Sequence, residues 1–292
     1  MENHKTVIVA GGDLRYGYTA SALAEKFETY AVGFTRQVIP DSVKLVDSPA
    51  EHLPMCDVLV LPMPVSDDGV LVNAPFSQSS LPLKDLISRL KPNALVLGGK
   101  FGKSQQLFEE AGIETVDYLA CEELSLRNAV PTAEGALQVM LEEMPCTIYG
   151  SRILILGFGR IGNRLAEILP ALGAEVTVSA RDVVKRAKAE MLGCKSISFT
   201  ELTACAGNFD VICNTVPAKV LTEPVLKHIS QETLILDLAS RPGGVDWEYA
   251  QKSGKKVVWA LSLPGKTAPV TAGEIIAETI LHILEERRIA DA

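Results

Sequence analysis

An apolar run passes through a glycine-rich turn into a helical pattern in Arg152-Ile-Leu-Ile-Leu-Gly157-Phe158-Gly159-Arg160-Ile161-Gly162-Asn-Arg-Leu-Ala166. In such a context the first glycine permits a tight strand-to-helix turn, the second lets the backbone approach a pyrophosphate, and the third lets the helix pack closely on its strand. The backbone amides at the start of the helix then face the phosphates. The stretch therefore predicts a dinucleotide site bound by residues 157–162. The alternative is that these glycines only interrupt a buried strand and helix.

Apolar runs on both sides of this stretch predict two parallel sheets. Downstream runs predict further strands at 174–179, 210–214, 233–237 and 256–259. Upstream runs predict strands at 7–10, 58–62 and 94–98, with helical patterns at 19–27 and 84–90. Short apolar runs that end in small or turn residues are typical of strands buried on both faces. We expect an α/β protein with two doubly wound, Rossmann-like domains.

The domain boundaries follow from a helical pattern at 131–144, ahead of the glycine-rich stretch. We expect a substrate domain at 1–130, a hinge helix and linker at 131–150, and an NADP-binding domain at 151–270. After a loop at 264–269, Thr271 and Glu274 have the spacing of a capping box, and a helical pattern follows. This last helix, within 271–292, is expected to pack on the first domain and leave a cleft between the domains.

Composition excludes several classes of function. The 292 residues suit about two domains, and 28 basic against 36 acidic residues give a net charge of −8. No chain-wide basic field exists for nucleic acid or an anionic membrane. The six cysteines form no Cys-x-x-Cys pair, so we expect no metal site and no disulfide framework. The polar start and the absence of a long apolar run predict a cytoplasmic protein.

Cofactor preference depends on the residues about twenty positions after the first glycine of the motif. A site for NAD usually offers Asp or Glu to the ribose there, whereas this chain has Ser179-Ala180-Arg181-Asp182. Ser179 and Arg181 suit a 2′-phosphate, because a guanidinium pairs with phosphate in a fork geometry. We therefore expect NADP. The alternative is that Arg181 is a solvated residue at a helix start and that Asp182 binds the ribose.

Two later strand ends complete the expected cofactor site. Asn214-Thr215-Val216-Pro217 follows one strand, and the amides of Asn214 and Thr215 are expected to line the cofactor, although a plain turn explains the segment equally well. Asp237-Leu-Ala239-Ser240-Arg241 ends the next strand. The small residues Ala239 and Ser240 would let the nicotinamide lie against the backbone, and Arg241 would face the cleft.

Four cations near predicted strand ends suggest a carboxylate-rich substrate: Arg15, Lys100, Arg241 and Lys266. Each alone is more consistent with a surface charge, but together they suit carboxylates. Asp13 and Glu134 are possible orienting partners or helix caps, and Ser66 and Thr132 complete the candidate substrate ligands. The histidines, at 4, 52, 228 and 282, avoid the predicted strand-end loops. A histidine general base of the 2-hydroxy-acid dehydrogenase type is therefore disfavoured. In that architecture the base lies just before the last helix, and this chain has Lys266 there.

Five motifs give the chain a resemblance to the family of the dipicolinate synthase A subunit. They are Gly11-Gly-Asp-Leu-Arg15, Pro131-Thr-Ala-Glu-Gly135, Gly157-Phe-Gly-Arg-Ile-Gly162, Asp237-Leu-Ala-Ser-Arg-Pro-Gly-Gly244 and Leu263-Pro-Gly-Lys-Thr-Ala-Pro269. The resemblance runs nearly end to end, and the last two motifs are the most specific. One departure is Tyr16, where the resemblance leads us to expect Gln.

The resemblance implies an NADP-dependent oxidoreductase of endospore formation that works with a flavoprotein-like B subunit of dipicolinate synthase. Its substrate would derive from 4-hydroxy-tetrahydrodipicolinate, which loses water and then two electrons to give dipicolinate. We assign the catalytic roles to Lys266, Arg241 and Asp237, and a homo-oligomer is possible. Two alternatives stay open: a dehydrogenase for another 2-hydroxy or 2-amino acid, and a protein that binds NADP(H) without catalysis.

Overall fold

The computed structural model describes residues 5–46, 52–287 and 289. Within them the chain forms two compact units. The first contains the described residues up to Asn128 and those from Ala268 onward, and the second runs from Ala129 to Thr267. Among the described residues, no helix has both the length and the apolar character needed to cross a bilayer.

The first unit is a six-stranded parallel sheet in the order β3-β2-β1-β4-β5-β6. Its strands are β1 (Thr6–Ala10), β2 (Glu28–Val32), β3 (Lys44–Val46), β4 (Cys56–Val60), β5 (Leu90–Gly98) and β6 (Glu114–Asp117). Its helices are α1 (Leu14–Leu23), α2 (Leu83–Ile87), α3 (Gln105–Glu110), α4 (Glu122–Arg127) and α12 (Pro269–Glu286), with single 3₁₀ turns η2 (Gly102–Ser104) and η3 (Tyr118–Ala120).

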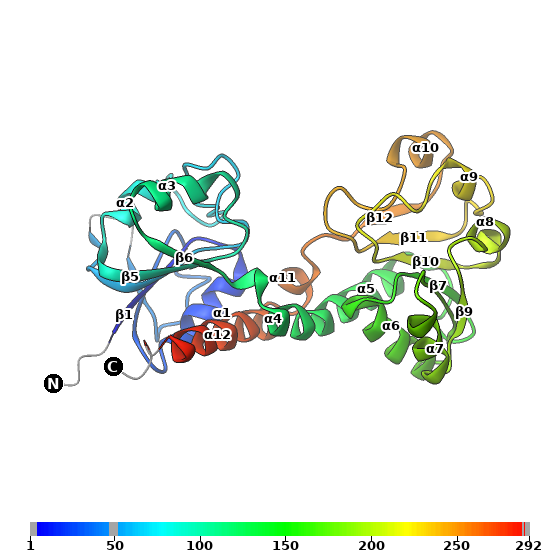
Figure 1. Cartoon of the computed structure of the whole chain (residues 1–292), viewed down its shortest axis with the longest axis horizontal. Coiled ribbons are helices and arrows are strands. Elements are labelled where there is room, and N and C mark those ends of the chain that lie inside the picture. The colour runs from blue at the N-terminus through cyan, green and yellow to red at the C-terminus, as the bar shows by residue number, and fades with distance from the viewer. Residues whose placement is uncertain (1–4, 47–51, 288, 290–292) are drawn as a thin grey trace. The chain divides into compact units, whose positions relative to one another are not determined.

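Alternating side chains of β1 divide the core of this unit between the two faces of the sheet. Val7 and Val9 pack with α1 and α12 on one face, and Ile8 packs with α2 and α3 on the other. Helices α1 and α12 lie side by side although they come from opposite ends of the chain (Figure 1). Gly273 of α12 allows this close approach, because a Cβ there would lie 2.4 Å from the Arg15 carbonyl oxygen.

The second unit repeats the architecture, with the strand order β12-β11-β10-β7-β8-β9. Its strands are β7 (Arg152–Leu156), β8 (Glu175–Ser179), β9 (Lys195–Ile197), β10 (Val211–Asn214), β11 (Leu234–Asp237) and β12 (Val257–Trp259). Its helices are α5 (Ala129–Glu143), α6 (Arg160–Ala171), α7 (Val183–Met191), α8 (Leu202–Cys205), α9 (Glu223–Leu226), α10 (Trp247–Lys252) and α11 (Leu263–Thr267), with the 3₁₀ turn η4 (Ala206–Asn208). The prediction of two doubly wound, Rossmann-like sheets is confirmed.

The expected loop at 264–269 and the expected start of the last helix were wrong. Residues Leu263–Thr267 form the helix α11, and α12 begins at Pro269. Proline at the first helical position has the φ that a helix start needs, so Thr271 and Glu274 lie inside α12 and form no capping box. Helix α1 also begins earlier than the pattern at 19–27 indicated, because Asp13 caps it. The expected helix within 271–292 includes residues 288 and 290–292, which lie outside the described residues.

Candidate functional site

The three motif glycines of the second unit have three different surroundings. Gly157 has φ +92°, and a Cβ there would lie 2.6 Å from the Thr215 hydroxyl oxygen. A Cβ on Gly162 would lie 2.2 Å from the carbonyl oxygen of Gly157, so this helix position tolerates no side chain without movement. A Cβ on Gly159 would meet no atom within 4 Å. The turn is therefore tightly packed at its first and third glycines and open at its second.

The open side of the turn adjoins the start of α6. Gly159 is the N-cap residue, and no side chain caps the helix, so no capping group competes with an anion at this helix start. Phe158 packs its ring in the core, so this residue can offer only its backbone to a ligand. Arg160 is exposed and Ile161 is half-buried. The residues present therefore fit the pyrophosphate of a dinucleotide.

The end of β8 carries the residues expected to select NADP. Ser179 is fully buried, and its hydroxyl has no hydrogen-bond partner. Ala180 is buried, whereas Arg181 is exposed, with its guanidinium 5.9 Å from the centre of the Phe199 ring. Asp182 caps α7 by accepting a hydrogen bond from the amide of Val184 at 2.8 Å. A carboxylate already engaged in a helix cap is less available to a ribose.

Arg186 is a residue near this strand end that the sequence analysis missed. Its Nη1 donates to the carbonyl oxygens of Ala180 at 2.9 Å and Arg181 at 3.0 Å. These bonds fix the backbone that carries Arg181. The signal was weak, because Arg186 lies one turn inside α7, where a cation is usually a surface charge.

The loop after β10 differs from the expectation that the amides of Asn214 and Thr215 line the cofactor. The Thr215 amide donates to the Leu156 carbonyl at 2.9 Å. Asn214 is fully buried, and its side chain bonds Val216 in both directions: Nδ2 donates to the carbonyl at 3.0 Å, and Oδ1 accepts from the amide at 3.1 Å. These groups brace the loop, in which Thr215 and Val216 are half-buried and Pro217 is exposed.

The loop after β11 is built around the carboxylate of Asp237. This side chain is fully buried and accepts hydrogen bonds from Asn214 Nδ2 at 2.8 Å, the Ala239 amide at 3.1 Å and the Gly244 amide at 2.9 Å. Ala239 is buried, whereas Ser240 and Arg241 are exposed. The loop thus presents the Ser240 hydroxyl and the Arg241 cation from a backbone that these hydrogen bonds hold in place.

Trp259 supports the same loop and was also missed. Its Nε1 donates to the Ala239 carbonyl at 3.0 Å, and the Arg241 guanidinium lies 5.9 Å from the centre of its ring. Trp259 stacks on Trp247 with ring centres 5.4 Å apart. From the sequence alone, a tryptophan at a strand end that supports a loop cannot be distinguished from one that only packs in the core.

In the first unit, Arg15 is almost fully buried and forms a two-point ion pair with Asp13. Its Nε donates to Oδ1 at 2.9 Å and its Nη2 to Oδ2 at 2.8 Å. Burial alone would lower the pKa of Arg15, but the hydrogen bond to Asp13 and the electrostatic attraction of Tyr16, Asp13 and Tyr118 together outweigh it, so the pKa is raised and the guanidinium stays charged. Asp13 therefore has both roles considered for it, because it also caps α1.

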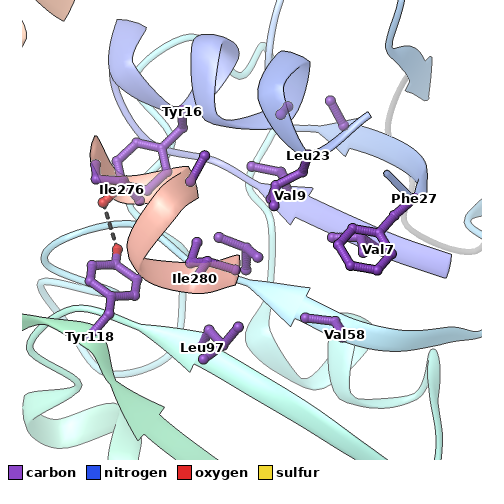
Figure 2. Close-up of a cluster of buried hydrophobic side chains, with 14 of the residues drawn as sticks. Val7, Val9, Tyr16, Leu23, Phe27, Val58, Leu97, Tyr118, Ile276 and Ile280 are labelled. Atoms are coloured by element: carbon purple, nitrogen blue, oxygen red, sulfur yellow. Dashed lines mark hydrogen bonds between the residues drawn. The ribbon is translucent and has the colours of Figure 1, made fainter. Parts of the chain in front are cut away.

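Tyr16, the departure from the family pattern, forms a buried pair with Tyr118 (Figure 2). Their hydroxyl oxygens are 2.7 Å apart, and Tyr118 donates to the Leu61 carbonyl at 2.8 Å, so Tyr16 is the donor within the pair. Burial raises the pKa of Tyr16 to about 12, and burial also raises that of Tyr118. Both hydroxyls are therefore protonated and directed into the core.

The other candidate substrate ligands lie on two different units. Lys100 is exposed, with φ +57° and its amide bonded to Asp117 at 3.1 Å. Ser66 belongs to a turn in which its hydroxyl donates to Asp68 at 2.9 Å. Thr132 and Glu134 lie on α5 of the second unit.

Lys266 is exposed on α11, which packs against α5. A Cβ on Gly135 of α5 would lie 2.8 Å from the Thr267 hydroxyl oxygen and 2.9 Å from Leu263 Cβ. The structure thus joins two motifs that lie far apart in the sequence, at 131–135 and 263–269. The expected meeting of all four cations stays a prediction.

The described histidines lie at the surface of their units. His52, His228 and His282 are exposed, and His282 Nδ1 lies 2.9 Å from Glu123 Oε2, whereas His4 lies outside the described part. In that part, no three His, Cys, Asp or Glu side chains lie close enough together to hold a metal ion.

Comparison with known proteins gives a consistent result for both units. Residues 6–119 match the family described as the N-terminal domain of the dipicolinate synthase A subunit. Residues 129–235 match "D-isomer specific 2-hydroxyacid dehydrogenase, NAD binding domain". The second match agrees with the open glycine turn at the start of α6.

Whole-chain relatives carry the same name. The dipicolinate synthase A subunit of Bacillus subtilis (strain 168) is 32% identical over 285 residues, which cover 96% of each chain. The crystal structure of the dipicolinate synthase A subunit from Bacillus halodurans has a TM-score of 0.89 at 29% identity and covers 96% of this chain and 97% of its own. The crystal structure of the Bacillus subtilis A chain has a TM-score of 0.86 at 31% identity, with 98% and 97% covered.

Proposed function

The chain belongs to the family of the dipicolinate synthase A subunit, and from this premise we propose that it is an NADP-dependent dehydrogenase that forms dipicolinate. The substrate is dihydrodipicolinate, which arises from 4-hydroxy-tetrahydrodipicolinate by loss of water. Its ring loses a hydride and a proton and becomes the aromatic pyridine-2,6-dicarboxylate. The reaction serves endospore formation, and the chain acts with a flavoprotein-like B subunit.

One observation carries the proposal: the uncapped start of α6 beside the open position at Gly159. Space and a helix start without a capping side chain coincide there, as a pyrophosphate requires. The match of residues 129–235 to a dehydrogenase NAD-binding domain supports a nicotinamide cofactor.

The preference for NADP rests on the end of β8. Arg181 and Arg186 provide positive charge, and Ser179 provides a buried hydroxyl without a partner. Asp182, the residue that would favour NAD, is engaged as the cap of α7. A 2′-phosphate supplies acceptors that such donors need.

In this mechanism the chain binds and orients the substrate and does not need to supply a strong base. When bound, NADP supplies the hydride acceptor. Arg241 holds one substrate carboxylate from the loop that Asp237 organises, while Ala239 and Ser240 leave room for a flat ring. Aromatisation favours loss of the proton, so orientation, which lowers barriers by several kcal/mol, is the main contribution.

Arg241 is proposed to bind one substrate carboxylate, and Arg15, Lys100 and Lys266 are the other candidate carboxylate ligands. Replacing Arg15 or Arg241 by alanine should raise the substrate KM, or lower turnover, by about tenfold or more, because a charge-assisted hydrogen bond is lost. The KM for NADP should stay near that of the wild type. Wild-type kinetics in both variants would exclude Arg15 and Arg241 as ligands of the substrate carboxylates.

The direct test is product absorbance when the purified chain meets freshly made substrate with NADP or with NAD, with and without the B subunit. We expect turnover with NADP, and Arg181→Ala should weaken NADP binding far more than NAD binding. Arg164→Ala, which removes a half-buried arginine that pairs with Glu167 further along α6, is the control. Equal binding of NAD and NADP by the wild type would exclude the 2′-phosphate site.

The same assay separates the alternatives. Turnover only when the B subunit is present would favour a protein that binds NADP(H) while its partner performs the chemistry. Activity on another 2-hydroxy or 2-amino acid, with none on the dihydropyridine, would favour a different dehydrogenase.

A further inference from the structure

One buried pair of side chains joins the two strand-end loops of the second unit. Asn214 ends β10, Asp237 ends β11, and these residues are register partners in the sheet. Asn214 Nδ2 donates to Asp237 Oδ1 at 2.8 Å, and both side chains are fully buried. The contact therefore connects the loop at 214–217 with the loop at 238–244.

The carboxylate of Asp237 has little capacity left for a ligand. Oδ1 accepts from Asn214 and from the Ala239 amide, and Oδ2 accepts from the Gly244 amide. Hydrogen bonds from backbone amides to a carboxylate are about twice as strong as neutral ones. A group that is enclosed in this way does not reach a substrate proton, but it holds both ends of its own loop.

Two consecutive glycines let the loop close on these side chains. Gly243 has φ +83°, and a Cβ there would lie 2.8 Å from Asp237 Oδ2. A Cβ on Gly244 would lie 2.1 Å from Asn214 Nδ2. Only glycine lets the backbone come this close, so Gly243 and Gly244 are required for the loop to pack on the Asn214–Asp237 pair.

Trp259 holds the loop at a second point. Its Nε1 bonds the Ala239 carbonyl, and its ring lies 5.9 Å from the Arg241 guanidinium. A cation over an indole face is stabilised electrostatically. Arg241 is thus carried on a segment that is fixed by Asp237 at both ends and by Trp259 in between.

We infer that Asp237 is a positioning residue, which acts with Asn214 and Trp259 to hold Arg241 in place for a substrate carboxylate and which takes no proton itself. This inference rests on the proposed function for the identity of the substrate. It replaces the catalytic role that the sequence alone suggested for Asp237.

A double-mutant cycle between Asp237→Asn and Arg241→Ala tests the inference in the full chain. The side-chain NH2 group of an asparagine at 237 cannot accept the hydrogen bond from the Gly244 backbone amide, so the loop loses one of its hydrogen bonds. Arg241→Ala should raise the KM for the dicarboxylate about tenfold in the wild type, but at most about twofold in the Asp237→Asn background. The KM for NADP and the shape of the pH profile of kcat should not change.

Asp210→Asn is the matched control, because Asp210 lies just before β10 and binds Arg152 at the opposite end of the strand. It should leave all kinetic constants near wild type. Independent effects of Asp237→Asn and Arg241→Ala, with loss of one limb of the pH profile, would overturn the inference and restore a proton-transfer role.

A second readout does not depend on turnover. The two tryptophans of the chain, Trp247 and Trp259, are stacked beneath this loop. Asp237→Asn should change their near-UV circular dichroism without changing the far-UV spectrum. An unchanged near-UV spectrum would count against the inference, whereas inactivity of the wild type itself would count against the proposed function alone.

If Asp237→Asn does not fold, Trp259→Phe loosens the same loop from its other anchor. This variant keeps an aromatic ring but removes the bond from Nε1 to the Ala239 carbonyl. It should also reduce the effect of Arg241→Ala on the KM for the dicarboxylate. An undiminished effect of Arg241→Ala would overturn the role of Trp259.

Discussion

Asp182 shows how a helix cap and a ligand compete for one carboxylate. From the sequence, this residue was the alternative that would have favoured NAD. In the structure it accepts the amide hydrogen bond of Val184 and begins α7. A capping carboxylate contributes about 1 kcal/mol to its helix, so recruiting it to a ribose would carry that cost. Sequence spacing alone cannot distinguish the two uses, because both place an acidic residue just after a strand.

The surroundings of Gly159 lead to a prediction for a single side chain. Gly159→Val should fold normally, because a Cβ there meets nothing within 4 Å, but it should abolish dinucleotide binding because the side chain fills the space for the pyrophosphate. Calorimetric titration with NADP and thermal unfolding measure the two properties. Gly162→Val, which would collide with the Gly157 carbonyl, should instead lower the unfolding temperature. Retained binding in a folded Gly159→Val would place the site elsewhere.

At the scale of elements, burial decided which strands the sequence revealed. The apolar runs at 7–10, 58–62, 94–98 and 152–156 all became strands with buried side chains. Four strands were missed: β2, β3, β6 and β9. The last three lie at sheet edges, are three or four residues long and carry exposed or half-buried side chains, whereas β2 (Glu-Thr-Tyr-Ala-Val) lies inside its sheet but has no continuous apolar run. An edge strand satisfies only one neighbour and needs no apolar run.

Helix α11 was missed for a related reason. Its sequence, Leu263-Pro-Gly-Lys-Thr, contains two residues that disfavour helices. Its stability comes from packing on α5, with Leu263 and Thr267 against Gly135. Contacts that form between distant segments override local propensity.

The α5–α11 contact predicts the effect of a change at Gly135. Gly135→Val should destabilise the protein by roughly 1–3 kcal/mol, because the added side chain overpacks the interface with Leu263 and Thr267. Urea unfolding measures the free energy. Gln138→Val places the same side chain at an exposed position of the same helix and should change stability much less. Equal effects would exclude overpacking at Gly135 as the cause, because helix propensity alone would favour Val over Gly but disfavour Val relative to Gln.

At the scale of the whole molecule, the sequence nominated candidate charges for the site but not the groups that support them. Arg15, Arg181 and Arg241 could be nominated because cations near strand ends are few. Trp259 and Arg186 could not, because their contribution arises from contacts with backbone carbonyls. Such contacts depend on how loops from different strands fold back, which local spacing does not encode.

Buried acidic groups in both units predict how stability depends on pH. Burial raises the pKa of Cys213 to about 12 and that of Tyr16 to about 12, and burial also raises the pKa of Tyr118. Each group has a higher pKa folded than unfolded, so its stabilisation is complete below its unfolded pKa and is lost as pH rises toward the folded value. The free energy of unfolding should therefore fall between about pH 9 and pH 12.

Denaturant unfolding across this range, for the wild type and Cys213→Ala, measures the effect. Removing one titrating thiol should reduce the slope by up to about 1.4 kcal/mol per pH unit. The exposed Cys146, replaced by alanine, should leave the slope unchanged. A wild-type stability independent of pH in this range would contradict the prediction.

The start of α1 has a consequence for binding stoichiometry. Both units place a glycine of positive φ after the first strand, and each glycine amide donates to the end of the next strand at 2.9 Å, Gly11 to Val32 and Gly157 to Ser179. The helix that follows is capped by the carboxylate of Asp13 in the first unit and by Gly159, which has no side chain, in the second. The first unit therefore carries a built-in anion where the second leaves room for a phosphate. A titration should saturate at one dinucleotide per chain, although the chain contains two folds of the nucleotide-binding type.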